Sequence, residues 1–173
     1  MTFVECDAPA TSMLDRKLVQ AACFSDCFRA PLRRSGLPAT DIFLAIFAHH
    51  PWWMKLALVI RNKAASLAGL DAPSASAALR IERKDRYAVG DTIGVWPIFA
   101  LSNDEVVAGR NNKHLDFRVS VLKARDGDAS SVTVSTICVV NNLLGNIYLS
   151  AIIPFHRNGA RKLMTNALAA GRL

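Results

Sequence analysis

The feature that most constrains the fold of this chain is a change of hydrophobic period near residue 92. From Thr92 onwards the hydrophobic period is two, and strands are predicted at 92–100, 104–109, 114–124 and 131–140. The alternation is strict from His114 to Val119, whereas in 131–140 it gives way to Ile137 and Val139. Alternation with a period of two is typical of strands with one buried face, and short runs of turn residues separate these segments. We therefore predict an antiparallel meander in this half of the chain.

A long amphipathic helix is predicted after the last strand, with Asn141 or Asn142 as its N-cap. Its apolar stripe is predicted to consist of Leu144, Tyr148, Ala151, Phe155, Leu163 and Ala167. The opposite side carries Asn146, Ser150, Arg157 and Arg161. Pro154 is expected to bend the helix near its middle. A single antiparallel sheet cannot bury its apolar face alone, so we expect this helix to lie across the sheet, often with a cavity beneath it.

The chain before residue 92 predicts one strand and two helices. The run from 18 to 32 predicts a strand in its second half, while its first half fits a strand or a helical turn equally well. Thr40 is a suitable N-cap for a helix that ends near His49, and a second helix is predicted from Trp52 to Ala68, after Pro51. The whole pattern predicts an α+β, helix-grip-like fold: an antiparallel sheet with a helix pair near the amino terminus and a long carboxy-terminal helix packed across the sheet.

Length and composition predict one packed domain, 1–173, with a core of about 18–170. A content of 51% hydrophobic and 20% charged residues excludes intrinsic disorder. The first seven residues contain two acids and no base, unlike a signal or transit peptide, so we expect a cytoplasmic protein. Reduced, mostly buried thiols are then expected for all the cysteines, Cys6, Cys23, Cys27 and Cys138. Their spacing does not fit a zinc site, and we predict no metal and no cofactor.

The formal charge of +7 raises the question of a nucleic-acid partner. The excess is confined to the helical segments: 29–70 carries +5 and 129–173 carries +4, while the strands between them are balanced. No recognition helix or sheet with basic and aromatic residues interleaved is evident in the sequence. We therefore expect no specific nucleic-acid partner.

The helix pair predicted around residue 50 is strongly apolar, with fifteen of the nineteen residues from Ile42 to Ile60 apolar. Two histidines, a proline and Lys55 interrupt the run, which argues against a membrane span. The pair could instead be interfacial, with Trp52 and Trp53 at the depth of the lipid headgroups and Lys55 meeting anionic lipid. The simpler alternative is that both helices pack on the sheet.

The strongest candidate for a polar site is a strand on which His114, Asp116 and Arg118 share one face. As a functional site, Asp116 would orient His114 while Arg118 receives an anion, which suits acid–base chemistry or carboxylate binding. As a structural feature, the three would form a solvated row of ion pairs outside the sheet, and the apolar residues of the other face favour this alternative. No phosphate loop, nucleophile elbow or zinc motif accompanies them, so we favour a function other than catalysis.

Several short motifs resemble a known family. They are Phe28–Leu32, Pro51–Trp53, Trp96–Ile98, Asn112–Arg118, Asn141–Gly145 and Pro154–Arg157. They resemble a bacterial family of unknown function, whose members occur alone or as the carboxy-terminal module of short-chain-dehydrogenase-like proteins. The resemblance extends over about residues 20–168. The resemblance implies a helix-grip-like fold and gives weight to His114, Asp116, Arg118 and His156. It implies no reaction and, because this chain lacks the Rossmann part, no nicotinamide cofactor.

These observations lead to one main functional hypothesis and two alternatives. The main hypothesis is a domain that binds a small, apolar or amphipathic molecule between the sheet and the last helix. Its pocket would be lined by Trp96, Phe99, Tyr148 and Phe155, with His114, Arg118 or His156 fixing a polar or anionic group.

The first alternative is a peripheral membrane or partner-docking module that uses Trp52, Trp53 and Lys55. The second is an uncharacterised enzyme acting through His114 and Asp116. The sequence leaves a homo-oligomer open.

Overall fold

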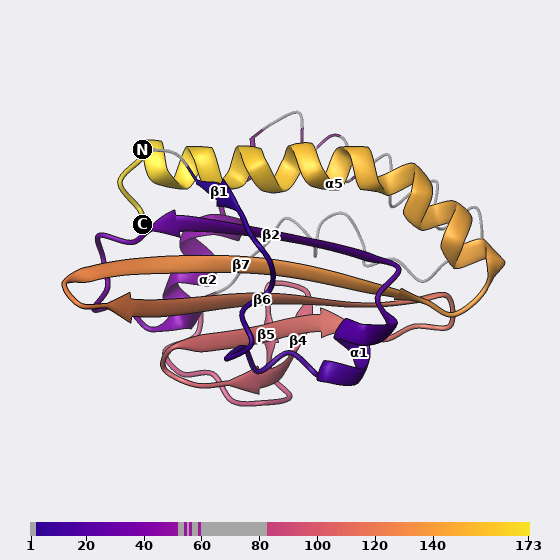
Figure 1. Cartoon of the computed structure of the whole chain (residues 1–173), viewed down its shortest axis with the longest axis horizontal. Helices are drawn as coiled ribbons and strands as arrows, with labels where there is room; N and C mark the ends of the chain where they lie inside the picture. Colours follow the sequence, from indigo (N-terminus) through magenta and orange to yellow (C-terminus); the bar gives the residue numbers. More distant parts are fainter. Residues whose placement is uncertain (1–2, 52–53, 55, 57–58, 60–82) are drawn as a thin grey trace.

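The computed structural model describes residues 3–51, 54, 56, 59 and 83–173. Within them the chain is α+β: an open, seven-stranded antiparallel sheet with a long carboxy-terminal helix packed against it (Figure 1). The strands are β1 (Val4–Glu5), β2 (Phe24–Pro31), β3 (Thr92–Ile93), β4 (Trp96–Leu101), β5 (Glu105–Arg110), β6 (Leu115–Asp126) and β7 (Ala129–Val140). The helices are α1 (Arg16–Ala21), α2 (Ala39–Phe47) and α5 (Leu143–Ala169). The predicted fold class is confirmed.

The meander predicted from the alternating segments is present as β4 to β7, which are neighbours in the order β1-β2-β7-β6-β5-β4-β3. The long hairpin of β6 and β7 is paired from Leu115 opposite Val140 to Asp126 opposite Ala129. The segment predicted as one strand over 92–100 is divided into β3 and β4. Gly94 explains the division, because its φ of +63° turns the chain back so that β3 pairs with β4.

The strand predicted in the second half of 18–32 is β2, and the first half contains α1, the helical one of the two alternatives. β2 pairs antiparallel with β7, from Phe24 opposite Cys138 to Pro31 opposite Ser131. The amino-terminal part of the chain therefore extends the sheet beyond the last strand of the meander.

The prediction of Thr40 as a helix cap is wrong, because α2 begins one residue earlier, at Ala39. Pro38 is its N-cap and supplies no side-chain hydrogen bond. The first N–H of the helix, that of Ala39, has no capping side chain and donates instead to the backbone carbonyl of Asn103 (3.0 Å). Beyond this helix, the one predicted from Trp52 to Ala68 lies outside the described residues except at positions 54, 56 and 59.

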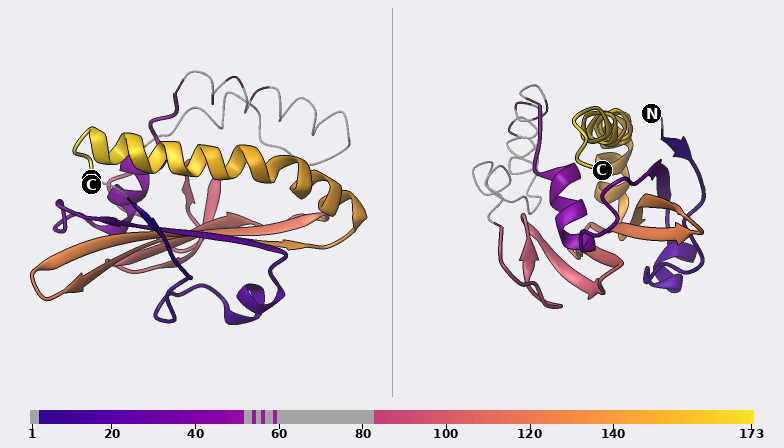
Figure 2. Two further views of the ribbon diagram at one scale, coloured as in Figure 1. Left: turned by 45° about the horizontal axis from the view of Figure 1, so that its top comes forward. Right: turned by 90° about the vertical axis from the view of Figure 1, so that its left-hand side faces the viewer.

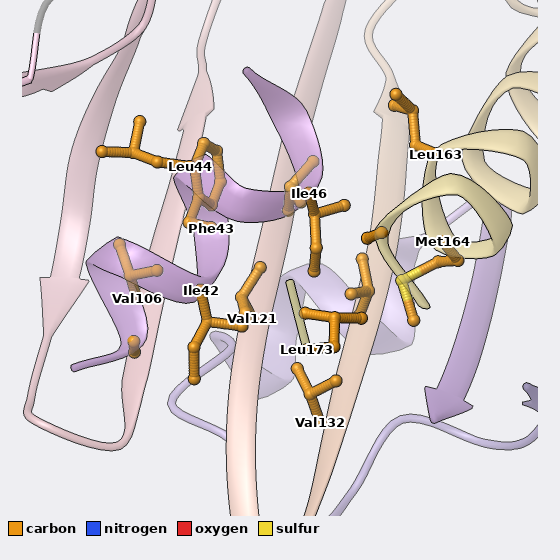
Figure 3. Close-up of a cluster of buried hydrophobic side chains, with 14 of the residues drawn as sticks. Ile42, Phe43, Leu44, Ile46, Val106, Val121, Val132, Leu163, Met164 and Leu173 are labelled. Carbon is orange, nitrogen blue, oxygen red and sulfur yellow. The ribbon is translucent and has the colours of Figure 1, made fainter. Parts of the chain in front are cut away.

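The main core lies between the sheet and the two helices α2 and α5 (Figure 3). Ile42, Phe43 and Ile46 of α2 reach the sheet, and Val119 and Val121 of β6 point towards them. Leu163, Met164 and Ala167 of α5, together with Leu173, close the same cluster. The apolar face of β6 is therefore the face that meets the helices.

The opposite face of the sheet is covered by the amino-terminal segment rather than by solvent alone (Figure 2). Leu14 packs there with Val107 and Ile137, and Leu18 of α1 packs against this second cluster. The sheet thus has two covered faces, which we call the helix face, under α2 and α5, and the segment face, under residues 6–22.

Helix α5 begins at one of the two predicted caps, since Asn142 is its N-cap and the side-chain Oδ1 of Asn142 accepts a hydrogen bond from the Gly145 N–H (3.1 Å). Its axis changes direction in the amino-terminal part (Figure 1), and Pro154 lies inside the helix.

The predicted apolar stripe of α5 is correct only in the carboxy-terminal half. Leu163 and Ala167 are buried as predicted, whereas Leu144, Ala151 and Phe155 are exposed. The side of the first turns that meets the sheet is instead marked by Gly145 and Leu149. The reason is a close approach, because a Cβ added at Gly145 would lie only 2.0 Å from the carbonyl oxygen of His114.

Candidate functional site

The three polar residues predicted to act together on β6 have separate partners. Nδ1 of His114 lies 3.0 Å from Oδ1 of Asn142, the cap of α5. Asp116 accepts a hydrogen bond from the backbone N–H of Asn112 (3.1 Å). These contacts tie the start of β6 to the turn before it and to the start of α5, and they do not join His114 to Asp116.

Arg118 lies on the segment face and is 6% exposed. Its guanidinium donates to the Phe117 carbonyl (2.8 Å) and lies 3.5 Å from the centre of the Phe99 ring. Burial lowers the pKa of the Arg118 guanidinium, although the charges of Asp116 and Asp15 oppose this shift. Arg118 is thus packed under a ring and hydrogen-bonded to backbone, on the side of the sheet away from α5.

The residues predicted to line a ligand pocket are spread over the molecule. Trp96 packs edge-to-face with Phe43 and Phe117 beside the main core. Phe99 lies on the segment face with Arg118. On α5, Tyr148 and His156 turn towards the sheet.

Phe155 of the same helix is 67% exposed. Of the predicted pocket residues, Tyr148 packs against the small cluster that contains Phe24, and the His156 ring meets the Phe24 ring.

The residues predicted to contact a membrane or partner, Trp52, Trp53 and Lys55, lie outside the described residues. Among the helices that the structure describes, none is both long and apolar enough to cross a bilayer.

A buried polar pair lies between the sheet and the amino-terminal half of α5. Oδ2 of Asp26, on β2, is 3.1 Å from Nε2 of His156, on α5. The Asp26 side chain is only 8% exposed, against 31% for His156. Despite the short distance the two groups are not aligned for a hydrogen bond, and neither oxygen of Asp26 accepts one from any residue that the structure describes. We call this pair the Asp26–His156 site.

The surroundings of the Asp26–His156 site are mostly apolar, although Thr136 is paired opposite Asp26 and the Arg157 guanidinium lies 5.4 Å from the centre of the Phe24 ring. A small buried cluster of Phe24, Leu115, Cys138 and Leu149 lies there, separate from the main core. The Phe24 ring meets the His156 ring edge-to-face, with centres 5.6 Å apart. Burial raises the pKa of the Cys138 thiol to about 12, and the negative charge of Asp26 adds to this rise. A carboxylate thus lies in a largely dry environment with one imidazole at its edge.

Another buried carboxylate, that of Glu105 on the segment face, is surrounded by hydrogen-bond donors. Glu105 of β5 accepts hydrogen bonds from the Ser120 hydroxyl (2.5 Å) and the Met13 N–H (2.7 Å), and also from the Ser12 hydroxyl. These donors come from the sheet and from the amino-terminal segment. Glu105 therefore fastens that segment to the sheet and has a structural role.

Sequence reasoning missed Asp26, although a signal for it exists. Alternation along β2 places Asp26 on the same face as Phe24 and Phe28, both of which are buried. A carboxylate within an apolar strand face is unusual and marks either a structural pair or a site. Its partner His156 comes from a distant part of the sequence, and only the packing of α5 brings the two together.

An open hollow of about 600 Å³ lies elsewhere, between the carboxy-terminal ends of α2 and α5. His49, His50, Asn166 and Arg172 supply its polar lining. Burial lowers the pKa of His49, and the nearby charge of Arg172 lowers it further. Arg172 also donates to the Ala45 carbonyl (2.9 Å), which joins the end of the chain to α2.

In the part of the chain that the structure describes, no three acidic, histidine or cysteine side chains are grouped as metal ligands. The Asp26–His156 site contains one carboxylate, that of Asp26, and both of its oxygens are able to accept further hydrogen bonds.

Comparisons with known proteins give one match. Residues 18–163 match the model of a family described as "Protein of unknown function (DUF2867)". No match was found among curated proteins or among solved structures. The bacterial origin and the fusion to short-chain-dehydrogenase-like modules stay predictions. Because the family model covers most of the chain, including β2 and most of α5, this protein belongs to that family of unknown function.

Proposed function

We propose that this domain binds a small, largely apolar molecule between β2 and the amino-terminal half of α5, and that the polar end of the molecule donates a hydrogen bond to Asp26. The observation that carries the proposal is the buried Asp26 carboxylate, which accepts no hydrogen bond from the described part of the chain. A buried polar group left without a partner costs about 1–3 kcal/mol, and more when it is charged. A ligand that supplies a donor would recover this free energy on binding.

The charge of the site selects the polar end of the ligand. Asp26 is an acceptor, so a hydroxyl or an amine fits it, whereas a carboxylate would meet a like charge at close range. The expectation from the sequence was a polar or anionic group fixed by His114, Arg118 or His156. We narrow it to an uncharged or cationic group that donates a hydrogen bond. Of these three residues, only His156 lies at the site.

The apolar part of the ligand would lie along the small cluster beneath α5. Tyr148 and Ile153 pack against this cluster from α5, and its buried members are Phe24, Leu115, Cys138 and Leu149. Access would be along the edge between β2 and α5, where His156 is partly exposed while Asp26 is not. An amphipathic molecule entering there would place its polar end at Asp26 and its chain against aromatic and aliphatic side chains.

The proposal is tested with probes that share one alkyl chain and differ at the polar end. Octylamine, octanol and octanoate are titrated into the full chain by calorimetry. We expect saturable binding of the amine and the alcohol and much weaker binding of the acid. Asp26→Asn should weaken amine binding at least tenfold, whereas Asp116→Asn, which changes a carboxylate on the segment face, should leave it unchanged. Equal binding of all three probes, or an unaffected Asp26→Asn variant, would overturn the proposal.

A second candidate function, association with an anionic membrane surface, is favoured by a different observation. The outward side of the amino-terminal half of α5 carries Leu143, Ile147 and Phe155, and Ile147 is 61% exposed. No acidic residue follows Asp128 in the sequence, and Arg157 and Lys162 of α5 are exposed. Apolar side chains beside bases suit the interface of an anionic bilayer.

Flotation with vesicles of phosphatidylcholine and phosphatidylserine at low salt tests this candidate. The double variant Ile147→Ser, Phe155→Ser should lose flotation, whereas Val89→Ser, at an exposed valine outside α5, should retain it. Failure of the unaltered protein to float would exclude membrane binding by this surface.

A further inference from the structure

Two cysteines from different parts of the chain lie in direct contact at one edge of the sheet. β1 pairs with β2 so that Glu5 is opposite Phe28, and the next pair in that register is Cys6 with Cys27. The Cys6 N–H donates to the Cys27 carbonyl (3.1 Å), and the two sulfur atoms are 3.0 Å apart. Directly opposed residues in antiparallel strands have Cα atoms about 4.5–5.5 Å apart, within the range of about 4.4–6.8 Å that a disulfide spans.

We propose that Cys6 and Cys27 are a site of oxidative modification, at which a small-molecule disulfide converts the two thiols into an intramolecular disulfide. In the first step the Cys6 thiolate attacks one sulfur of the small disulfide and releases one small thiol. In the second step the Cys27 sulfur attacks the Cys6 sulfur of the mixed disulfide and releases the other. The protein loses two hydrogen atoms, and the small disulfide is reduced to two thiols.

The environments of the two sulfurs set this order of attack. Cys6 is half-buried, whereas Cys27 is buried. Burial raises the pKa of the Cys27 thiol to about 12, and the hydrogen bond and charge of Cys6 add to the rise. Cys6 is therefore the first nucleophile, because a protonated, buried thiol reacts poorly. Once Cys6 carries the mixed disulfide, its thiol hydrogen bond and charge no longer raise the pKa of Cys27. Burial still raises this pKa, while the hydrogen bond with Ser135 and the charge of Arg29 lower it.

The disulfide would fasten the segment that covers one face of the sheet. Between the two cysteines lie Ser12 and Met13, which bond to Glu105, and the buried Leu14. A link from Cys6 to Cys27 closes this segment into a loop whose two ends are joined at the edge strand. Closing a loop removes conformational freedom from the unfolded chain, so the oxidised protein should unfold at a higher temperature.

The other two cysteines provide an internal control. Cys23 is exposed, and its thiol faces the Ala21 carbonyl (3.9 Å). Cys138 is buried on the helix face, away from the Cys6–Cys27 contact. Neither is expected to join the disulfide.

The test is oxidation of the folded full chain with oxidised glutathione, followed by alkylation, proteolysis and mass spectrometry. We expect one peptide pair linked through Cys6 and Cys27, a mass lower by two hydrogen atoms and a raised unfolding temperature that returns to its original value with dithiothreitol. Cys27→Ser should retain glutathione on Cys6, Cys6→Ser should form no link, and Cys23→Ser should behave as the unaltered chain. A stable mixed disulfide on Cys6 in the unaltered chain would overturn the proposal, as would a link that forms only in urea or one that joins another pair.

Discussion

Each face of the sheet buries a carboxylate, and the two carboxylates differ in the hydrogen-bond donors around them. On the segment face, Glu105 accepts hydrogen bonds from the hydroxyls of Ser12 and Ser120 and from the Met13 N–H. On the helix face, Asp26 lies 3.1 Å from His156 and accepts no hydrogen bond from the residues that the structure describes. Burial is common to both groups, so the difference lies in the donors.

This difference distinguishes a carboxylate with a structural role from one whose oxygens can still accept hydrogen bonds from a ligand. A buried charge is tolerated when donors surround it, and its removal then leaves those donors without a partner. A buried charge without donors reduces the stability of the fold, so its removal should cost little. Glu105 belongs to the first class and Asp26 to the second, and each of the following experiments probes that assignment.

The largest effect is expected for Glu105→Ala. The substitution leaves two hydroxyls and one amide without their acceptor and should lower the free energy of unfolding by about 3 kcal/mol. Urea unfolding measures the change, with Asp126→Ala, at the exposed end of the same sheet, as the control. A loss below about 1 kcal/mol would show that Glu105 does not fasten the segment.

The next largest effect is expected for Gly145→Ala, which bears on how α5 is held above Asp26. The new methyl group would lie 2.0 Å from the His114 carbonyl oxygen, so the helix must shift, at a cost of about 2 kcal/mol. Gly159→Ala, later in the same helix, meets the flexible end of Met54 at 3.2 Å and, among the described residues, no backbone atom, so it should be tolerated. Equal stabilities of the two variants would contradict the close approach that orients the first turns of α5.

Alkaline pH should reveal a further effect at the buried thiols, which for one thiol is at most about 1.4 kcal/mol between pH 9 and pH 10. Folding raises the pKa of Cys138 from 9.0 to about 12, so the folded state holds the proton more tightly than the unfolded state. This contribution is complete below pH 9 and is lost as the pH rises towards 12, with a slope of up to about 1.4 kcal/mol per pH unit for one thiol. Cys138→Ala should make the decline of stability above pH 9 shallower, whereas Cys23→Ser, at an exposed thiol, should leave the slope unaltered.

The smallest change in stability is expected for Asp26→Asn. Because no hydrogen bond to the carboxylate is lost, the free energy of unfolding should stay within about 1 kcal/mol of the unaltered protein or rise. Glu105→Gln is the matched comparison and should cost more, since the new amide cannot accept from all three donors. An Asp26→Asn variant that is less stable than Glu105→Gln would reverse the assignment of the two carboxylates.

The sequence predicted the parts of the fold that depend on local pattern. Alternation from Thr92 onwards identified the meander, and Asn142 identified the start of α5, because both signals lie within a few consecutive residues. The cap of α2 was predicted wrongly, because the loop residue Asn103 satisfies the first amide of that helix in place of Thr40.

The candidate site depends on contacts that no local pattern encodes. The orientation of the first turns of α5 follows from the approach of Gly145 to His114, which turned Phe155 outwards. The same packing brought His156 to Asp26, on a strand from the other end of the chain. Alternation in β2 placed the Asp26 carboxylate on a buried face, and only the pairing of β2 with β7 and the position of α5 showed that it lacks donors.

The most direct test of the account is the carboxyl ¹³C NMR signal of each buried acid during a titration with octylamine. If the domain binds donors at Asp26, the Asp26 signal shifts with a saturable dependence on the amine, while the Glu105 signal stays in place because its donors are already present. An Asp26 signal that does not move, or one that moves together with Glu105, would contradict the proposed site.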